Sequence, residues 1–327
     1  MNIEVNINLT NNLQKDNRLD GNIVYDIIVV GGGPAGLSAA LYSRRKGAKV
    51  GLIVKDVGGQ VVNTSTVENY LGYSSISGED LMKRFQEHVN NVDVPISKYS
   101  AVEALRVVED SPIKEVLLSD GSSYKARSII LATGSRSRKL NVPGEEEFLG
   151  KGVAYCAICD GPLFAGTEVI IAGGGNSAVE AAIDLAKIAS KVTLVHRSQF
   201  RADEILIEQL EKLDNVDIHL NTQIQEIVGE KMVTGVNVLD KLAGDAYTIP
   251  ASGVFVEIGY IPNSEQFKDV IKLNDRREIV VDKYGETNVK GIFSAGDVTD
   301  SAYKQIIIAA ADGAKCALSA NGYLNTL

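Results

Sequence analysis

The chain has 327 residues, of which 45% are hydrophobic and three are cysteine, and it carries a formal net charge of −9. This length suits about two domains with ordinary buried cores. Three cysteines are too few for the disulfide framework of a small secreted protein, which indicates a reducing compartment such as the cytoplasm, and the negative charge argues against nonspecific binding to nucleic acid or to anionic membranes.

Residues 1–22 are expected to form a flexible tail. They are polar, rich in Asn and Asp, and contain neither a basic start nor a continuous apolar stretch. We therefore expect neither a secretory signal nor a membrane span in this segment.

Two βαβ units are expected after the tail, each with a strand, a glycine-rich turn, a helix and a second strand. The strands are short apolar runs rich in Val and Ile, which are typical of buried parallel strands. The chain therefore holds two dinucleotide-binding folds. The expected strand, helix and strand are 24–30, 37–46 and 49–54 in the first unit, and 168–172, 177–187 and 191–196 in the second.

Shorter strands and a closing helix surround these units. Turn signals separate the strands, and the chain is expected to cross between domains near 136–144 and 260–264. If the closing helix packs beside the first unit, the second domain is an insertion within the first. The further strands are expected at 102–108, 115–118, 128–131, 253–259 and 291–294, and the closing helix at 303–323.

Both glycine-rich turns have the G-x-G-x-x-G/A spacing between a strand and a helix. The first position permits the tight turn, the second lets a pyrophosphate approach the backbone, and the third lets the helix pack closely on the strand, so alanine is accepted there. Asp56, after the second strand, is a candidate for a ribose hydroxyl. The three positions are Gly31, Gly33 and Gly36 in the first turn and Gly173, Gly175 and Ala178 in the second.

The segment after the second unit favours a phosphorylated nucleotide. His196, Arg197 and Arg201 place cations where the adenosine ribose would lie, and a 2′-phosphate accepts charge-assisted hydrogen bonds from guanidinium groups. We therefore favour NADPH over NADH. The alternative is a solvated strand end with ordinary surface arginines.

A dithiol motif lies between the two units, at Cys156-Ala157-Ile158-Cys159. Two intervening residues let both sulfurs share one helical turn, where a disulfide can open and close. A zinc site would need a second ligand pair, which neither Cys316 nor the three histidines supply, so redox chemistry is the strongest interpretation. Asp160 could supply a proton, or it could cap a helix end. Cys316 falls on the apolar face of the closing helix and is expected in the core.

Gly296 and Asp297 follow an expected strand and precede an expected helix. Backbone amides and one carboxylate could hold a polyol and a phosphate there. Alone, this pair is also a common turn.

Together these residues resemble the low-molecular-weight, bacterial-type thioredoxin reductases from Tyr25 to Leu324. Six segments carry the resemblance in the same order as in that family. They are GGGPAGL (31–37), GGQ with ENY (58–60 and 68–70), ATG (132–134), CAICDG (156–161), GGGNSAVE (173–180), and AGDV with KQ (295–298 and 304–305).

The resemblance implies an α/β fold of two Rossmann-like, three-layer ββα nucleotide-binding domains, the second inserted in the first. It implies an FAD-binding domain at 23–138 and 264–327, and an NAD(P)H-binding domain at 139–263 that carries the dithiol. Cys159 would face the flavin, Cys156 would attack the disulfide of thioredoxin or a thioredoxin-like protein, and Asp160 would act as general acid. The implied FAD contacts are Gly31, Gly33, Pro34, Ala35, Gly36, Gly58, Gly59, Gln60, Asn69, Ala132, Gly296, Asp297, Lys304, Gln305 and Ile306, and the implied NADPH contacts are Gly173, Gly175, Asn176, Ser177, Ala178, His196, Arg197 and Arg201.

The resemblance also implies a homodimer, and two departures leave alternatives open. Ser198 replaces a second arginine of the family pattern and the segment is one residue shorter, so NADH or another donor remains an alternative. Segments 286–291 and 303–309 are closer to the flavoprotein component of alkyl hydroperoxide reductase, which suggests a peroxiredoxin-directed thioredoxin-like partner. Because one flavin would serve both nicotinamide and dithiol, we expect the inserted domain to rotate between them.

Overall fold

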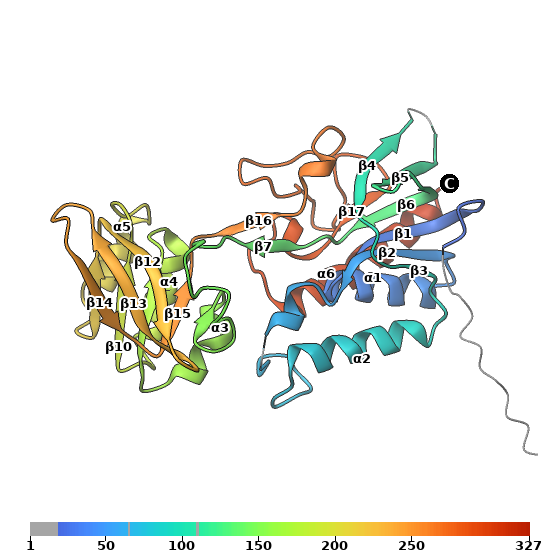
Figure 1. Cartoon of the computed structure of the whole chain (residues 1–327). Coiled ribbons are helices and arrows are strands. Elements are labelled where there is room, and N and C mark those ends of the chain that lie inside the picture. Colours follow the sequence, from blue (N-terminus) through green and yellow to red (C-terminus); the bar gives the residue numbers. More distant parts are fainter. Residues whose placement is uncertain (1–18, 65, 109–110) are drawn as a thin grey trace, which may run out of the picture.

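The structure is a computed structural model that describes residues 19–64, 66–108 and 111–327. Figure 1 shows two lobes joined by a narrow waist. Most of the expected tail lies outside the described residues. Leu19, at its end, is 8% exposed and packs in the core of the first lobe beside Tyr25.

The first lobe is built on a seven-stranded sheet with the order β3-β2-β1-β6-β5-β4, and β17 pairs with β6. The central strand β1 is parallel to both neighbours, β2 and β6. It is buried on both faces, as its unbroken apolar run predicts. The strands are β1 (Val24–Gly32), β2 (Val50–Val57), β3 (Ile96–Ser97), β4 (Val102–Val107), β5 (Lys114–Leu118), β6 (Ser123–Leu131) and β17 (Ile292–Ser294).

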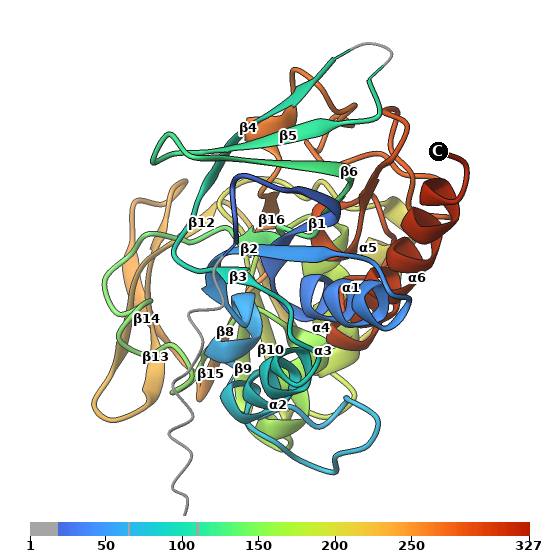
Figure 2. The same cartoon turned by 90° about the vertical axis from the view of Figure 1, so that its right-hand side faces the viewer.

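Three helices lie along one face of this sheet: α1 (Pro34–Arg45), α2 (Gly78–Asn90) and α6 (Ile306–Leu324). The closing helix α6 lies directly against α1, which Figure 2 also shows. Gly313 allows this approach, because a Cβ there would come within 2.0 Å of the Ala35 carbonyl oxygen. The end of the chain therefore returns to the first βαβ unit.

The second lobe has three layers. A five-stranded sheet with the order β11-β10-β9-β15-β8 lies in the middle, and an antiparallel sheet β12-β13-β14 covers one of its faces. Alternate residues of β9 divide between the layers: Ile170 packs toward the small sheet and Ile171 toward α4. The elements are β8 (Val153–Ala154), α3 (Ala157–Asp160), β9 (Glu168–Ala172), α4 (Asn176–Leu185), β10 (Lys191–Val195), α5 (Glu204–Leu210), β11 (Val216–His219), β12 (Thr222–Gly229), β13 (Val233–Asp240), β14 (Ala246–Pro250) and β15 (Gly253–Val256).

The waist is an antiparallel pair of short strands, β7 (Ser135–Ser137) and β16 (Tyr260–Pro262). A glycine with positive φ precedes each strand: Gly134 has φ 67° and Gly259 has φ 96°. Few side chains restrict these turns, since a Cβ at Gly134 would meet no atom within 4 Å. The two crossovers between lobes therefore lie side by side. Short 3-10 turns also occur at Gly59–Asn63, Gly161–Phe164, Glu265–Phe267 and Gly296–Val298.

The expected α/β fold class with two Rossmann-like domains is confirmed. Within the described part of the chain, no helix has the length and apolarity that a bilayer crossing requires.

Candidate active site: a disulfide beside a glycine-lined cavity

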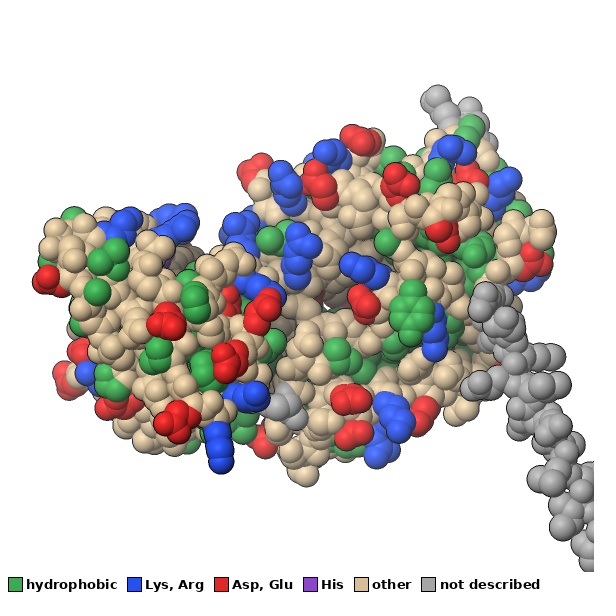
Figure 3. Space-filling model, in the orientation of Figure 1, with side chains coloured by type: hydrophobic (Ala, Val, Ile, Leu, Met, Phe, Trp, Pro, Cys, Tyr) green, Lys and Arg blue, Asp and Glu red, His purple; other side chains and the backbone are tan. Residues whose placement is uncertain are grey.

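A cavity of about 1060 Å³ lies where the two lobes meet. The first lobe lines it with the turn that contains Gly31 and Gly33, and the second lobe lines it with Cys156, Cys159 and Asp160. The junction between the lobes is visible in Figure 3. The cavity therefore joins the first glycine-rich turn and the dithiol, which lie more than a hundred residues apart in the sequence.

The first glycine-rich turn has the geometry that a bound pyrophosphate requires. Gly31 has φ 124°, and a Cβ there would lie 2.0 Å from the Ala132 carbonyl oxygen. A Cβ at Gly36 would lie 1.9 Å from the Gly31 carbonyl oxygen, whereas Gly33 faces open space. Gly33 is the N-cap of α1 and no side chain caps the helix. Pro34 has no N–H and the Leu37 N–H bonds the Gly33 carbonyl, so the Ala35 and Gly36 amides can bind an anion. This site therefore fits a dinucleotide such as FAD.

Most of the residues that the resemblance assigns to FAD gather around this cavity. Asn69 Nδ2 donates to Gln305 Oε1 at 3.2 Å, and Gln60 contacts Ser135 at 3.4 Å. The lining contains Gly31, Gly33, Pro34, Ala35, Gln60, Asn69, Ala132, Asp297, Lys304, Gln305 and Ile306. Asp56 lines it as well.

Four assigned glycines lie behind the lining rather than in it: Gly36, Gly58, Gly59 and Gly296. They shape the wall. Gly296 has φ 75°, and a Cβ there would lie 2.9 Å from Ala35 Cβ. These positions are therefore filled by glycine because neighbouring backbone and side chains leave no room, or because the backbone turns through positive φ.

The cavity carries both signs of charge. Burial raises the pKa of the Asp297 carboxyl, which has no ion-pair partner among the described residues. Lys304 Nζ bonds the Thr299 carbonyl and lies 3.3 Å from Glu278. Figure 3 shows Lys and Arg side chains gathered on the upper side of the junction. The basic residues of the lining, which would attract a pyrophosphate, are Lys55, Arg136, Lys139, Arg277 and Lys304.

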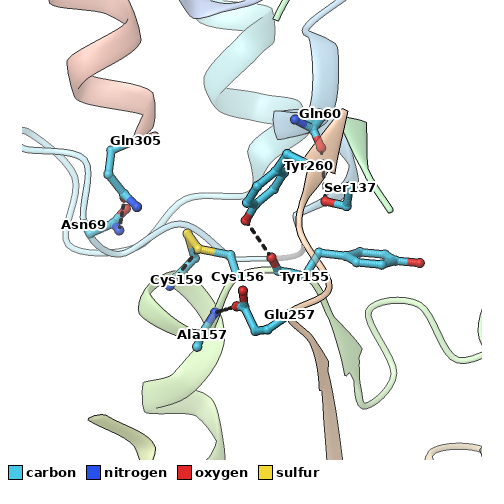
Figure 4. The surroundings of a disulfide bond; sticks show 10 residues. All are labelled: Gln60, Asn69, Ser137, Tyr155, Cys156, Ala157, Cys159, Glu257, Tyr260 and Gln305. Carbon is cyan, nitrogen blue, oxygen red and sulfur yellow. Dashed lines mark hydrogen bonds between the residues drawn. A yellow bond between two sulfur atoms is a disulfide. The ribbon is translucent and has the colours of Figure 1, made fainter. Parts of the chain in front are cut away.

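Cys156 and Cys159 form a disulfide across one turn of helix, as their spacing predicts. Cys156 is the N-cap of α3, and its Sγ accepts a hydrogen bond from the backbone N–H of Cys159 at 3.2 Å. Between them, Ile158 points outward and is 67% exposed. Figure 4 shows the sulfur pair on the side of α3 that faces Asn69 and Gln305. The disulfide therefore lies at the cavity, while Ile158 faces solvent and Ala157 is buried.

Asp160 lines the same cavity at the end of α3. Burial raises the pKa of its carboxyl to about 6. Roughly a tenth of the side chain would then carry a proton at pH 7. A carboxyl in this state can exchange protons near neutral pH, which is what a general acid needs.

Sequence reasoning missed Glu257 and two tyrosines beside the disulfide. Glu257 Oε1 accepts a hydrogen bond from the Ala157 N–H at 3.2 Å, and burial raises the pKa of this carboxyl to about 7. Tyr260 on β16 donates its hydroxyl to the Tyr155 carbonyl at 3.1 Å. No motif marks these residues. Their positions are explained by the observed strand ends: Glu257 directly follows β15 and Tyr155 directly follows β8, and parallel strands bring their carboxyl ends to one edge of a sheet.

The second glycine-rich turn belongs to the same lobe as the disulfide but lies outside the cavity lining. A Cβ at Gly173 would lie 2.3 Å from the Glu257 carbonyl oxygen, and one at Gly174 would meet the His196 ring. Gly175 faces open space and is the N-cap of α4, which no side chain caps. The Ala178 N–H bonds the Gly175 carbonyl, so this turn offers a dinucleotide the amides of Asn176 and Ser177 at the start of α4.

The expected cations beside this turn differ in character. Arg197 and Arg201 are exposed. His196 is buried, and burial lowers its pKa, with Arg201 and Arg197 adding to the shift. His196 is therefore neutral at pH 7, and its Nε2 lies 3.1 Å from Ser198 Oγ. The exposed arginines supply positive charge here, and Lys241 Nζ adds to it, donating to the Arg197 carbonyl at 3.3 Å.

Cys316 is buried in the core of the first lobe, as expected. Its Sγ donates to the Ser294 carbonyl at 3.1 Å, and burial raises the pKa of the thiol to about 12. It therefore takes no part in the dithiol site.

Comparison with known proteins places this arrangement in a family. The family described as "pyridine nucleotide-disulphide oxidoreductase" matches this chain over residues 25–313. Thioredoxin reductase from Streptococcus pyogenes MGAS5005 has a similar structure, with a TM-score of 0.89 and 37% identity, over 94% of this chain and 100% of that one. Similar curated sequences include one component of the alkyl hydroperoxide reductase of Pseudomonas putida and a protein named NADH dehydrogenase from Bacillus subtilis. Each is 44% identical, over 94% and 92% of this chain respectively.

This chain spans 59% of the length of the Pseudomonas putida protein and 58% of that of the Bacillus subtilis protein. By contrast, it covers the whole of the Streptococcus pyogenes chain. The resemblance found in the sequence is confirmed at the level of the family. The chain belongs to the pyridine nucleotide-disulphide oxidoreductase family, whose thioredoxin reductase members use FAD and a pyridine nucleotide.

Proposed function

We propose that the chain is a flavoprotein disulfide reductase acting on thioredoxin or a thioredoxin-like protein. Electrons would pass from a pyridine nucleotide through FAD and the Cys156–Cys159 dithiol to the partner disulfide. One observation carries this proposal: the disulfide and the first glycine-rich turn line the same cavity. A disulfide with only a structural role would have no reason to face a dinucleotide site.

The residues of the cavity have distinct tasks in this proposal. Bound FAD supplies a two-electron carrier between nucleotide and sulfur. Cys159 faces the flavin, and Cys156 attacks the partner disulfide through a mixed disulfide. Asp160 exchanges the proton that accompanies thiol formation, which its raised pKa supports.

NADPH is the donor that the two exposed arginines favour. A guanidinium group bonds a 2′-phosphate through charge-assisted hydrogen bonds. The second candidate is an NADH-linked reductase of a peroxiredoxin-directed thioredoxin-like protein. Ser198 and the neutral His196 favour it, as does 44% identity to an alkyl hydroperoxide reductase component and to a protein named NADH dehydrogenase.

The domain assignment is part of the same proposal. FAD would bind to 23–138 with 264–327, and the nucleotide to 139–263, which would rotate about the waist so that nicotinamide and dithiol reach the flavin in turn. The second glycine-rich turn supports this, because it lies outside the cavity that the disulfide lines. We further propose a homodimer in the cytoplasm.

Anaerobic titration of the flavin-loaded protein tests the proposal. NADPH or NADH should bleach the flavin, and oxidised thioredoxin should then restore its absorbance. Cys156→Ser should spare bleaching and stop transfer to thioredoxin, whereas Cys316→Ser, in the core, should leave transfer intact. Transfer that survives in Cys156→Ser, or a flavin that neither nucleotide bleaches, would refute the assigned route.

A further inference from the structure

Glu257 links the dithiol helix to the second glycine-rich turn. Its backbone N–H donates to the Ala172 carbonyl at 2.8 Å, at the end of β9. Its carbonyl oxygen lies against Gly173, and its side chain reaches the first residue of α3. Figure 4 shows the Glu257 carboxyl beside the backbone of Cys156 and Ala157. One residue therefore contacts both parts of the second lobe that would exchange electrons with the flavin.

The Ala157 N–H is the contact that ties Glu257 to the cysteines. Ala157 follows Cys156 directly and begins the one-turn helix that ends with Cys159 and Asp160. An acceptor at this amide fixes the start of the helix and hence the direction of the Cys156 side chain. Negative charge at a helix start is favourable, but four residues give only a weak dipole.

The groups around the Glu257 carboxyl offer it no counter-ion. Tyr260 faces it from β16, and Asp160 lies at the far end of α3. Arg138 lies beside Gly259, in the turn that adjoins Glu257. Within the described residues no salt bridge joins Glu257 to a basic side chain. A buried carboxylate without a partner disfavours a second negative charge nearby.

We propose that Glu257 is a positioning residue of the dithiol whose carboxylate and the Cys156 thiolate exclude each other. This inference rests on the proposed function, in which the disulfide is opened by two electrons that reduced flavin supplies. Opening breaks the S–S bond and leaves sulfur anions that take up protons. The reduced site then holds one proton between the two groups: either Cys156 is a thiol and Glu257 is ionised, or Cys156 is a thiolate and Glu257 is protonated. The raised pKa of the carboxyl is consistent with this exchange near pH 7.

Alkylation of the chemically reduced protein tests the proton exchange without flavin turnover. A phosphine opens the disulfide, and iodoacetamide labelling of Cys156 is followed from pH 5 to 9 by fragment mass spectrometry. Wild-type reactivity should rise in two steps, because the two groups titrate together. Glu257→Gln should lose the step that Glu257 contributes, leaving any contribution of Asp160, and should label roughly three- to tenfold faster at pH 7, because a like charge has been removed.

Matched variants separate charge from position. Glu226→Gln removes a carboxylate on β12 that bonds Asn237 in the same lobe, and should leave the labelling curve unchanged. Glu257→Gln keeps an acceptor for the Ala157 N–H, whereas Glu257→Ala does not. Hydrogen exchange of that amide should therefore accelerate in Glu257→Ala and stay near wild type in Glu257→Gln.

Each result decides one part of the proposal. A Glu257→Gln labelling curve that matches wild type overturns the proton exchange, and equal amide exchange in Glu257→Ala and wild type overturns the positioning role. Failure of thioredoxin to accept electrons would refute the proposed function alone, because the labelling of the reduced protein requires neither FAD nor thioredoxin.

Discussion

Replacing Asp160 with Asn should change how stability depends on pH. Burial raises the pKa of the Asp160 carboxyl from 3.8 to about 6 in the folded protein. Between these values the folded state binds more protons than the unfolded chain, so the free energy of unfolding falls as pH rises through this window. Asparagine cannot ionise, and the variant should lose this part of the pH dependence.

The size of the effect follows from the shift. About two pKa units correspond to roughly 3 kcal/mol of unfolding free energy, fully lost above about pH 7. About half of that loss, roughly 1.4 kcal/mol, falls between pH 5 and pH 8, because the unfolded carboxyl is already largely ionised at pH 5. Asp160→Asn should therefore lose about 1.4 kcal/mol less than wild type over this range.

Urea unfolding of the oxidised protein, followed by circular dichroism at several pH values, measures the difference. Asp217→Asn is the control. Asp217 lies in the same lobe, and its pKa is lowered because it accepts a hydrogen bond from Lys191, so its contribution has the opposite sign. Removing it should not flatten the pH dependence. Parallel curves for wild type and Asp160→Asn would refute the burial of Asp160 as the cause.

Three further changes have defined outcomes. Gly36→Ala would place a Cβ 1.9 Å from the Gly31 carbonyl oxygen. It should lower the free energy of unfolding by about 1–3 kcal/mol, measured by urea unfolding, and reduce the bound flavin, measured by absorbance after gel filtration. Full flavin content would contradict this prediction. Arg197→Ala with Arg201→Ala should raise the KM for NADPH at least tenfold and leave the KM for NADH unchanged, since a hydrogen bond to a charged group contributes about 1.5–3 kcal/mol; equal loss with both nucleotides would show that the arginines do not read the 2′-phosphate. Gly259→Ala strains a backbone at φ 96° by roughly 1–2 kcal/mol. In stopped-flow experiments it should slow repeated turnover more than it slows a single reduction of the dithiol by bound flavin. Equal slowing of both rates would contradict a role of Gly259 in domain rotation.

The βαβ units could be predicted because their signals are local. The run before Gly31 became β1, and the runs around the second turn became β9 and β10 within a residue or two of the expected bounds. Each strand is buried on both faces, so its apolar character is continuous, and each turn needs glycine for steric reasons that hold in any protein. The residues of each segment and their immediate neighbours are therefore enough to predict its strands and its turn.

Elements whose stability comes from distant partners were missed. Helix α2 has Ser77 as its N-cap, which accepts from the Asp80 N–H at 3.0 Å, but five of its thirteen residues are charged and its buried face is limited to Gly78, Leu81, Met82 and Val89. The antiparallel sheet β12–β14 carries polar residues on its outer face and depends on pairing between strands. Glu257 was missed for a related reason: its importance arises from the Ala157 amide, which lies 100 residues earlier.

The narrow waist described above has an evolutionary consequence. Because the disulfide occupies the cavity while the second turn lies outside it, the nucleotide and the disulfide must reach the flavin one after the other in the proposed reaction. Higher concentrations of nucleotide or of the partner protein cannot remove the time that this alternation takes. Selection for a higher turnover rate would then act on the waist, at Gly134, Gly259 and the three-residue strands β7 and β16. Homologues could therefore differ in turnover rate while their cysteines stay identical.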